Sequence, residues 1–238
     1  PRAGAPRRAA ARCGTLDPDN CTVLVAGGAG VGKEVCKTLL DDGAWLNVFN
    51  RSQTFQKEIE MKGGITIKGD ALDAGKCKAV MESIDDLNVV VSTIGGTTAD
   101  PKADSEGNIN LINAAKERGV QRFVLVTSIG TGDSKQATPP NVYEALEPVL
   151  VEKAKAEEAL RASGMEYVII RPGGLKSEPA TGKGVLTEDT SVCGSITRED
   201  VAELVAKCLW SDEAVNKTVS AVDSEQVFGE AEFATIAA

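Results

Sequence analysis

The sequence contains no histidine among its 238 residues. This absence excludes Ser-His-Asp and Cys-His nucleophile pairs, histidine-based zinc sites and acid–base catalysis by imidazole. Any proton transfer must therefore use tyrosine, lysine, hydroxyl or carboxyl groups.

Closely spaced cysteine pairs are also lacking. The six cysteines are scattered along the chain without a Cys-x-x-Cys pair, at Cys13, Cys21, Cys36, Cys77, Cys193 and Cys208. Neither a zinc ribbon nor a disulfide framework is indicated, and isolated thiols are typical of a reducing compartment.

Long apolar runs and an excess of positive charge are missing as well. No run approaches the roughly 20 apolar residues of a transmembrane helix, so the sequence predicts at most a peripheral association with membranes. The net charge is -9, and without the four arginines of the first twelve residues the remainder carries -13. Such an acidic body is expected to repel nucleic acid.

The first 20 residues form a basic leader that we separate from the folded part. The segment "PRAGAPRRAAARCG" is rich in arginine and alanine and contains no acid, a composition typical of an organellar transit peptide. A disordered basic tail of a cytoplasmic protein is the alternative. We expect one domain over residues 21–222 and a short C-terminal tail over 223–238.

Short apolar runs alternate with helical patterns through that domain. Each run is rich in β-branched residues and ends near a turn, as buried strands do. The predicted fold is therefore α/β, a Rossmann-type doubly wound and mainly parallel sheet of about seven strands with six helices. The seven runs are "CTVLVAG", "WLNVFN", "ITIKGD", "NVVVSTI", "RFVLVTSI", "YVIIRP" and "KTVSAV".

Two loops are longer than usual, at residues 130–141 and 173–196. Both follow strands, so they lie at the carboxyl edge of the sheet, where open α/β folds bind ligands. We expect them to form the substrate side of the site.

The stretch "VLVAGGAGVGKEV" nearly fits two different phosphate-binding loops. As a nucleoside-triphosphate loop it has Lys33 after Gly32, but Glu34 stands where Ser or Thr would ligate magnesium. As a dinucleotide loop it needs only glycines whose amides approach a pyrophosphate at the start of a helix. A third interpretation is a tight strand-to-helix turn with no ligand.

The end of the second strand bears on the choice of cofactor. It reads Asn50-Arg51-Ser52, whereas NAD-selective enzymes carry Asp or Glu at this point to bind the ribose 2′-hydroxyl. A cation instead admits a 2′-phosphate, with Asn50 and Ser52 as hydrogen-bonding neighbours. NADP(H) is therefore favoured over NAD(H), with a solvated surface role for Arg51 as the alternative.

Several stretches in order resemble the atypical short-chain dehydrogenase/reductases. The similarity is to the NmrA-like branch, which includes biliverdin reductase B/flavin reductase-like proteins and plant plastid NADP-binding proteins. It spans roughly residues 22–222. The stretches are the glycine loop, "VFNRS", "KGDALD", "VVVSTIGG", "NLINAAKERGVQRFVLVTSIG", "KAEEALRASGMEYVIIRPGGL" and "ITREDVAELVAKCL".

The resemblance implies roles for the matching positions. The pyrophosphate would lie on Gly27, Gly30, Val31 and Gly32, and the 2′-phosphate on Arg51. The adenine would lie beside Asp70 and Ala71, and the ribose over Thr93, Ile94 and Gly95. The nicotinamide would lie near Thr127, Ser128, Pro172 and Gly173, with Lys153 on its ribose.

The chain departs from that family in two ways. Its glycine loop is one residue shorter than the family's G-x-x-G-x-x-G, which removes one amide donor. The family's Y-x-x-x-K pair is incomplete, because Val149 stands four residues before Lys153 and Tyr143 is followed at that spacing by Glu147. Lys153 as a solvated helix residue is therefore an open alternative.

Two functions follow as hypotheses. The first is an NADPH-dependent oxidoreductase that reduces a small conjugated acceptor, such as a quinone, a flavin or a tetrapyrrole-like molecule, with Ser128 and Lys153 as candidate catalytic residues. The second is a non-catalytic nucleotide-binding subunit or assembly factor of an organellar complex. The similarity to plastid proteins favours the chloroplast over the mitochondrion. A nucleoside triphosphatase remains a remote third hypothesis, and no metal site is predicted.

Overall fold

A computed structural model describes residues 15–52, 54–228 and 235. The predicted basic leader lies outside the described residues as far as residue 14, so its role in transport stays a prediction. Leu16 precedes the first strand and is only 2% exposed within the core. The packed domain therefore begins before residue 21.

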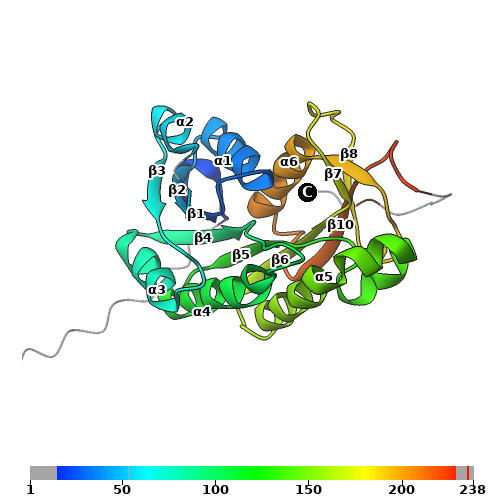
Figure 1. Cartoon of the computed structure of the whole chain (residues 1–238). Coiled ribbons are helices and arrows are strands. Elements are labelled where there is room, and N and C mark those ends of the chain that lie inside the picture. The colour runs from blue at the N-terminus through cyan, green and yellow to red at the C-terminus, as the bar shows by residue number, and fades with distance from the viewer. Residues whose placement is uncertain (1–14, 53, 229–234, 236–238) are drawn as a thin grey trace, which may run out of the picture.

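One sheet of eight strands runs through the described part of the chain, in the order β3-β2-β1-β4-β5-β6-β10-β8 (Figure 1). All neighbours pair in parallel except β8 with β10. The strands are β1 Thr22–Ala26, β2 Trp45–Asn50, β3 Ile65–Lys68, β4 Leu87–Ser92, β5 Arg122–Val126, β6 Glu166–Pro172, β8 Gly184–Thr187 and β10 Lys217–Asp223. The predicted doubly wound α/β fold is confirmed.

The second long loop contains more structure than the sequence predicted. It supplies β8, an antiparallel edge strand that makes the sheet eight-stranded. It also supplies β7, Gly174–Lys176, and β9, Ser195–Thr197, which pair in parallel beside the main sheet. These strands have three or four residues, too few for an alternating pattern to be recognised.

Helices cover both faces of the sheet because alternate residues of each strand face opposite ways. Val23 and Val25 pack with α1, Val31–Asp41, and α6, Arg198–Trp210. Leu24 and Ala26 pack on the other face, whose helices are α3 Ala74–Ser83, α4 Asn108–Arg118 and α5 Pro140–Arg161. The short helix α2, Gln56–Met61, follows β2. The short helical elements are the 3-10 helices η1 Pro18–Asn20 and η3 Gly132–Ala137 and the π-helical turn η2 Ala103–Gly107.

The first turn of α6 holds part of the second long loop in place. Thr197 caps the helix, its Oγ1 accepting a hydrogen bond from the Asp200 amide at 3.0 Å. The Asp200 carboxylate accepts hydrogen bonds from the amides of Thr181 and Gly182, both at 2.9 Å. The neighbouring Glu199 accepts one from the Ala180 amide at 2.8 Å. We refer to residues 177–182 as the α6-bound loop.

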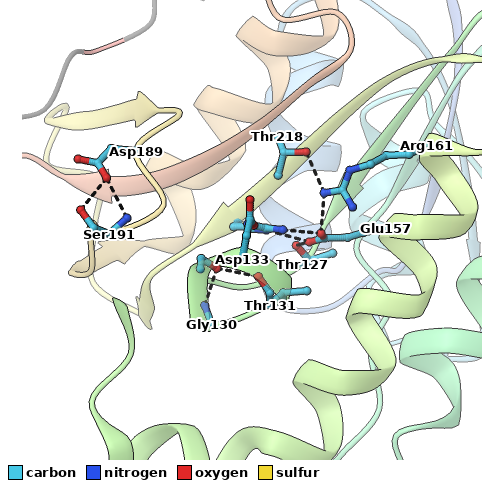
Figure 2. A network of polar contacts seen from close by, with 11 residues as sticks. Thr127, Gly130, Thr131, Asp133, Glu157, Arg161, Asp189, Ser191 and Thr218 are labelled. Carbon is cyan, nitrogen blue, oxygen red and sulfur yellow. Dashed lines mark hydrogen bonds and ion pairs between the residues drawn. The ribbon is translucent and has the colours of Figure 1, made fainter. Parts of the chain in front are cut away.

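A buried ion-pair network joins α5 to the ends of β5 and β6 (Figure 2). Glu157 and Arg171 are 1% and 2% exposed, and they form two hydrogen bonds of 3.0 and 2.7 Å. Glu157 also accepts hydrogen bonds from Thr127 Oγ1 at 2.8 Å and from Arg161 at 2.9 Å. Four donors thus compensate for removing this carboxylate from water.

Three further observations concern the described residues alone. Cys36, Cys77, Cys193 and Cys208 are free thiols. No group of three or more acidic or cysteine side chains is arranged to hold a metal ion there. None of the helices in this part of the chain is both long and apolar enough to cross a membrane.

Truncation of the buried carboxylate is expected to be costly. Glu157→Ala removes both hydrogen bonds between this carboxylate and the buried Arg171 guanidinium and leaves the exposed Asp133 as its ion-pair partner, which should lower the free energy of unfolding by about 3–5 kcal/mol. Urea denaturation measures the change. Glu158→Ala removes an exposed carboxylate one residue away and serves as the control, with an expected change below about 0.5 kcal/mol. Equal stabilities of the two variants would contradict the assigned role.

The hydrogen bonds to Asp200 predict a dependence of stability on pH. Burial opposes ionisation, but the hydrogen bonds from Thr181, Thr197 and Gly182 outweigh it and lower the pKa of Asp200 below its ordinary 3.8. A carboxylate whose pKa is lower in the folded state stabilises the fold above the unfolded pKa and loses that effect as the pH falls through the folded pKa. Asp200→Asn should therefore lower the free energy of unfolding at neutral pH.

The stability difference between wild type and Asp200→Asn should shrink as the pH falls below about 4. Urea denaturation at neutral and acidic pH measures it. A difference that is constant over that range would show that the ionised form of Asp200 contributes nothing to stability.

Candidate functional site

The glycine loop links β1 to the start of α1. Gly27 has φ 117° and Gly30 φ 55°, values in the left-handed half of backbone space that favour glycine. Gly30 is the N-cap of α1, so the helix begins at Val31. The amides of this first turn and the positive end of the helix dipole form an environment that suits an anion.

Two of these glycines allow a close approach between the loop and β4. A Cβ atom on Gly27 would lie 2.3 Å from Thr93 Oγ1, and one on Gly32 would lie 2.4 Å from the same atom. Thr93 in turn donates a hydrogen bond from its amide to the Ala26 carbonyl at 2.9 Å. The absence of side chains at Gly27 and Gly32 therefore lets the loop pack directly against Thr93.

A cavity of about 320 Å³ adjoins this loop and follows the carboxyl ends of β1, β2, β3 and β4. This is the crevice in which open α/β folds bind nucleotides. Its lining includes the predicted residues Gly27, Asn50, Arg51, Ser52, Asp70, Ala71, Thr93, Ile94 and Gly95. Its other lining residues are Gly28, Ala29, Phe49, Thr54, Phe55, Gly69 and Ala103.

Arg51 is one of the residues that line the cavity. Its side chain is 65% exposed, and its guanidinium lies 3.9 Å from the Asp70 carboxylate. Ser52 and Thr54 form a tight turn beside it, in which the Thr54 amide donates to Ser52 Oγ at 3.2 Å. An exposed guanidinium flanked by hydroxyl groups can bind a phosphate without displacing a buried ion pair.

Lys153 lies beside the end of β4, and the alternative of a solvated helix residue is wrong. Its Nζ forms an ion pair of 2.8 Å with Asp104, and the two side chains are 15% and 1% exposed. Asp104 also accepts a hydrogen bond from the Gly96 amide at 2.8 Å. A Cβ atom on Gly95 would lie 3.5 Å from Lys153 Nζ, so the ammonium group is fixed next to the Gly95 backbone.

The other predicted residues of the nicotinamide side lie at the ends of β5 and β6. Ser128 donates a hydrogen bond to the Ile129 carbonyl at 3.0 Å, and Thr127 donates to Glu157. Pro172 is connected to this turn, since its carbonyl accepts from the Ile129 amide at 2.9 Å. Gly173 follows directly. None of these four residues lines the described cavity, which covers the β1 to β4 side of the edge.

Lys33 makes contacts that disfavour the triphosphate interpretation of the loop. Its Nζ lies 3.1 Å from a Glu58 carboxylate oxygen and 4.3 Å from the centroid of the Phe55 ring. Glu34 is paired with Lys37 at 3.0 Å instead of facing a metal. The lysine of a triphosphate loop would instead bind phosphate oxygens.

Sequence reasoning missed two charged residues of this site. Asp104 positions Lys153 from η2, and no local pattern signals a partner 49 residues away in the chain. Arg198 lies beside Gly30, with its Nε 3.6 Å from the position of a Cβ on that glycine. It belongs to the stretch "ITREDVAELVAKCL", which contributed to the family resemblance without a role for this arginine.

Comparison with a family model gives the first independent identification. Residues 27–212 match the family described as NAD(P)H-binding. The match begins at the first glycine of the loop and ends just after α6, so it includes the whole carboxyl edge described above.

Individual relatives agree with this match. Sanguinarine reductase of Eschscholzia californica is 28% identical over 255 residues, which cover 88% of this chain and 92% of the relative. Protein TIC 62, chloroplastic, of Pisum sativum is 34% identical over 146 residues, covering 56% of this chain and 27% of the relative. A chloroplastic protein of Arabidopsis thaliana is 40% identical over 126 residues, covering 51% and 45%. The chain thus matches less than half the length of these two chloroplastic relatives.

Among solved structures, ChuY, an anaerobillin reductase from Escherichia coli O157:H7, superimposes with a TM-score of 0.78. It is 26% identical and covers 88% of this chain and 100% of its own. The chain therefore belongs to the NAD(P)H-binding family of Rossmann-type proteins, within the atypical, NmrA-like short-chain dehydrogenase/reductases.

Proposed function

We propose that this protein binds NADP(H) at the carboxyl edge of its sheet and reduces a small conjugated acceptor by hydride transfer. The observation that carries the proposal is that one cavity is lined both by residues of the glycine loop and by Arg51. This combination suits a dinucleotide whose pyrophosphate lies on the helix start and whose 2′-phosphate meets a cation. The family match and the reductases among the relatives support this class of reaction.

The proposed binding residues divide by the part of the nucleotide they contact. Backbone groups of the glycine loop suit a pyrophosphate, because a side chain at Gly27 or Gly32 would fill the space next to Thr93. The proposed assignment is Gly27, Gly30, Val31 and Gly32 to the pyrophosphate, Asn50, Arg51 and Ser52 to the 2′-phosphate, Asp70 and Ala71 to the adenine, and Thr93, Ile94 and Gly95 to the adjoining ribose.

On the acceptor side, the side chains of this protein mainly position the nicotinamide and the acceptor, and they do not supply a proton. NADPH supplies the hydride when it is bound. Lys153, held by Asp104, hydrogen-bonds to the nicotinamide ribose, and Ser128 orients the acceptor or a water molecule. Thr127, Pro172 and Gly173 border the nicotinamide. Val149 has no proton to donate where related reductases carry tyrosine, so the proton comes from water.

We place the acceptor among molecules that accept hydride without a strong protein acid, such as quinones, flavins or tetrapyrrole-like compounds. The similarity to an anaerobillin reductase supports the tetrapyrrole-like compounds, and the similarity to sanguinarine reductase supports the ring compounds such as quinones and flavins. The chloroplastic relatives support a chloroplast location.

Val149 supports a second candidate function, a nucleotide-binding subunit of an organellar complex that performs no turnover. NADPH oxidation with a panel of quinones, flavins and bilins separates the two. Turnover by the isolated protein supports the reductase, whereas tight NADPH binding without any turnover, together with co-purification in a large plastid complex, supports the subunit.

Removal of the Arg51 guanidinium should abolish the preference for NADPH. A charge-assisted hydrogen bond contributes about 1.5–3 kcal/mol, so Arg51→Ala should weaken NADPH binding roughly 10- to 100-fold and leave NADH binding almost unchanged. Fluorescence titration with both nucleotides measures this. Lys62→Ala removes a cation outside the cavity and is the control. An equal loss for NADPH and NADH in Arg51→Ala would contradict a 2′-phosphate contact.

Lys153 should affect nucleotide binding separately from stability. Lys153→Met leaves Asp104 buried and unpaired, which should destabilise the fold by about 3–5 kcal/mol. The double variant Lys153→Met with Asp104→Asn removes the unpaired charge and should recover most of that stability, while its NADPH affinity and turnover stay reduced. Denaturation and titration of both variants measure the two effects. Recovery of binding together with stability would mean that Lys153 has only a structural role.

A further inference from the structure

Arg198 brings a guanidinium group to the phosphate loop from the far end of the chain. It is the first residue of α6, and its Nε lies 3.6 Å from the position of a Cβ atom on Gly30. Apart from the residues adjacent to Gly30 in the chain, this is the one described atom within 4 Å of that position. Figure 1 shows α6 beside α1, and the two helices pack against each other in the core. Gly30 is the N-cap of α1, where the pyrophosphate is proposed to bind.

The charge environment of Arg198 differs from that of the other site cations. Lys33, Arg51 and Lys153 each lie within 4 Å of a carboxylate. Within residues 15–52 and 54–228, by contrast, no carboxylate forms an ion pair with Arg198, although the whole chain has a net charge of -9. Its Nη1 donates to Ser177 Oγ at 2.7 Å. A guanidinium has five N–H donors, so its remaining donors can bind an anion at Gly30.

Ser177 connects this guanidinium to the loop on the substrate side. It is the first residue of the α6-bound loop, residues 177–182. Three successive side chains at the start of α6 hold that loop: Arg198 binds Ser177, Glu199 binds the Ala180 amide, and Asp200 binds the next two amides. One turn of helix therefore contacts both the phosphate loop and the substrate-side loop.

We propose that Arg198 binds the pyrophosphate of the dinucleotide at Gly30 and, through Ser177, couples cofactor binding to ordering of the α6-bound loop. This inference rests on the proposed NADP(H) binding. The guanidinium supplies donors that the glycine loop lacks, since that loop is one residue shorter than in related proteins. The first turn of α6 is then the element through which an occupied cofactor site stabilises the wall of the acceptor site.

A comparison of two ligands tests the first half of the proposal. NADPH contains the pyrophosphate, whereas adenosine 2′-monophosphate contains only the adenosine and the 2′-phosphate. Arg198→Ala should weaken NADPH binding roughly 10- to 100-fold, as expected for a charge-assisted contact, and leave binding of adenosine 2′-monophosphate unchanged. Arg198→Lys, which keeps the charge but not the planar fork, should lie between wild type and Arg198→Ala. Lys207→Ala, an equal change of charge on the exposed side of the same helix, is the control.

Hydrogen exchange tests the second half. NADPH should slow exchange at the amides of Ala180, Thr181 and Gly182 in the wild type. Ser177→Ala should keep most of the NADPH affinity but lose this protection, because the guanidinium is no longer linked to the loop. Equal protection in Ser177→Ala and wild type would overturn the coupling.

The outcomes separate this inference from the function on which it rests. If the wild type binds neither NADPH nor NADH, the proposed function fails and the inference fails with it. If the wild type binds NADPH and Arg198→Ala binds it equally well, or loses affinity for adenosine 2′-monophosphate to the same extent, the function stands and the role of Arg198 is overturned.

Discussion

The close approach of the glycine loop to the end of β4 is the constraint on which the rest of the site depends. Gly27 and Gly32 both face Thr93 Oγ1 at distances that no Cβ atom tolerates. Because these glycines have no side chain, β1, the residue after β4 and the start of α1 meet at one point at the carboxyl edge. A site made of backbone and of a helix end needs neither a metal nor a histidine, and this chain contains no histidine.

Positive charge in this acidic protein is arranged around that point from widely separated parts of the chain. Arg51 lies at the end of β2, Lys153 comes from α5 and Arg198 from α6. Asp104 fixes Lys153, and Ser177 orients Arg198, so both cations are held by neighbours before a ligand arrives. Pre-orientation lowers the entropy cost of binding, which favours the proposed binding of a phosphate at the glycine loop.

The arrangement of the elements was predictable where local patterns are strong. β-branched runs that end near turns predicted the parallel strands. The edge strand β8 was not predictable, because its four residues lie in a glycine-rich loop and pair only through tertiary contacts with β10.

The site residues also differ in whether the sequence could locate them. Arg51 could be located from the end of the second strand, and Asp70 and Thr93 from the family resemblance, and all three line one cavity. Asp104 and Arg198 could not, because each acts on a residue distant in the chain and each follows from how helices pack.

The most direct test of the account is calorimetric titration of Gly30→Asp with NADPH. The side chain has room beside Arg198, but the φ of 55° at Gly30 strains any other residue, so circular dichroism and the unfolding midpoint must first establish that the variant is folded. A negative charge at the N-cap of α1 should then exclude the pyrophosphate. The account predicts no detectable heat of binding from a folded Gly30→Asp variant beside clear binding by the wild type, and wild-type affinity in that variant would contradict it.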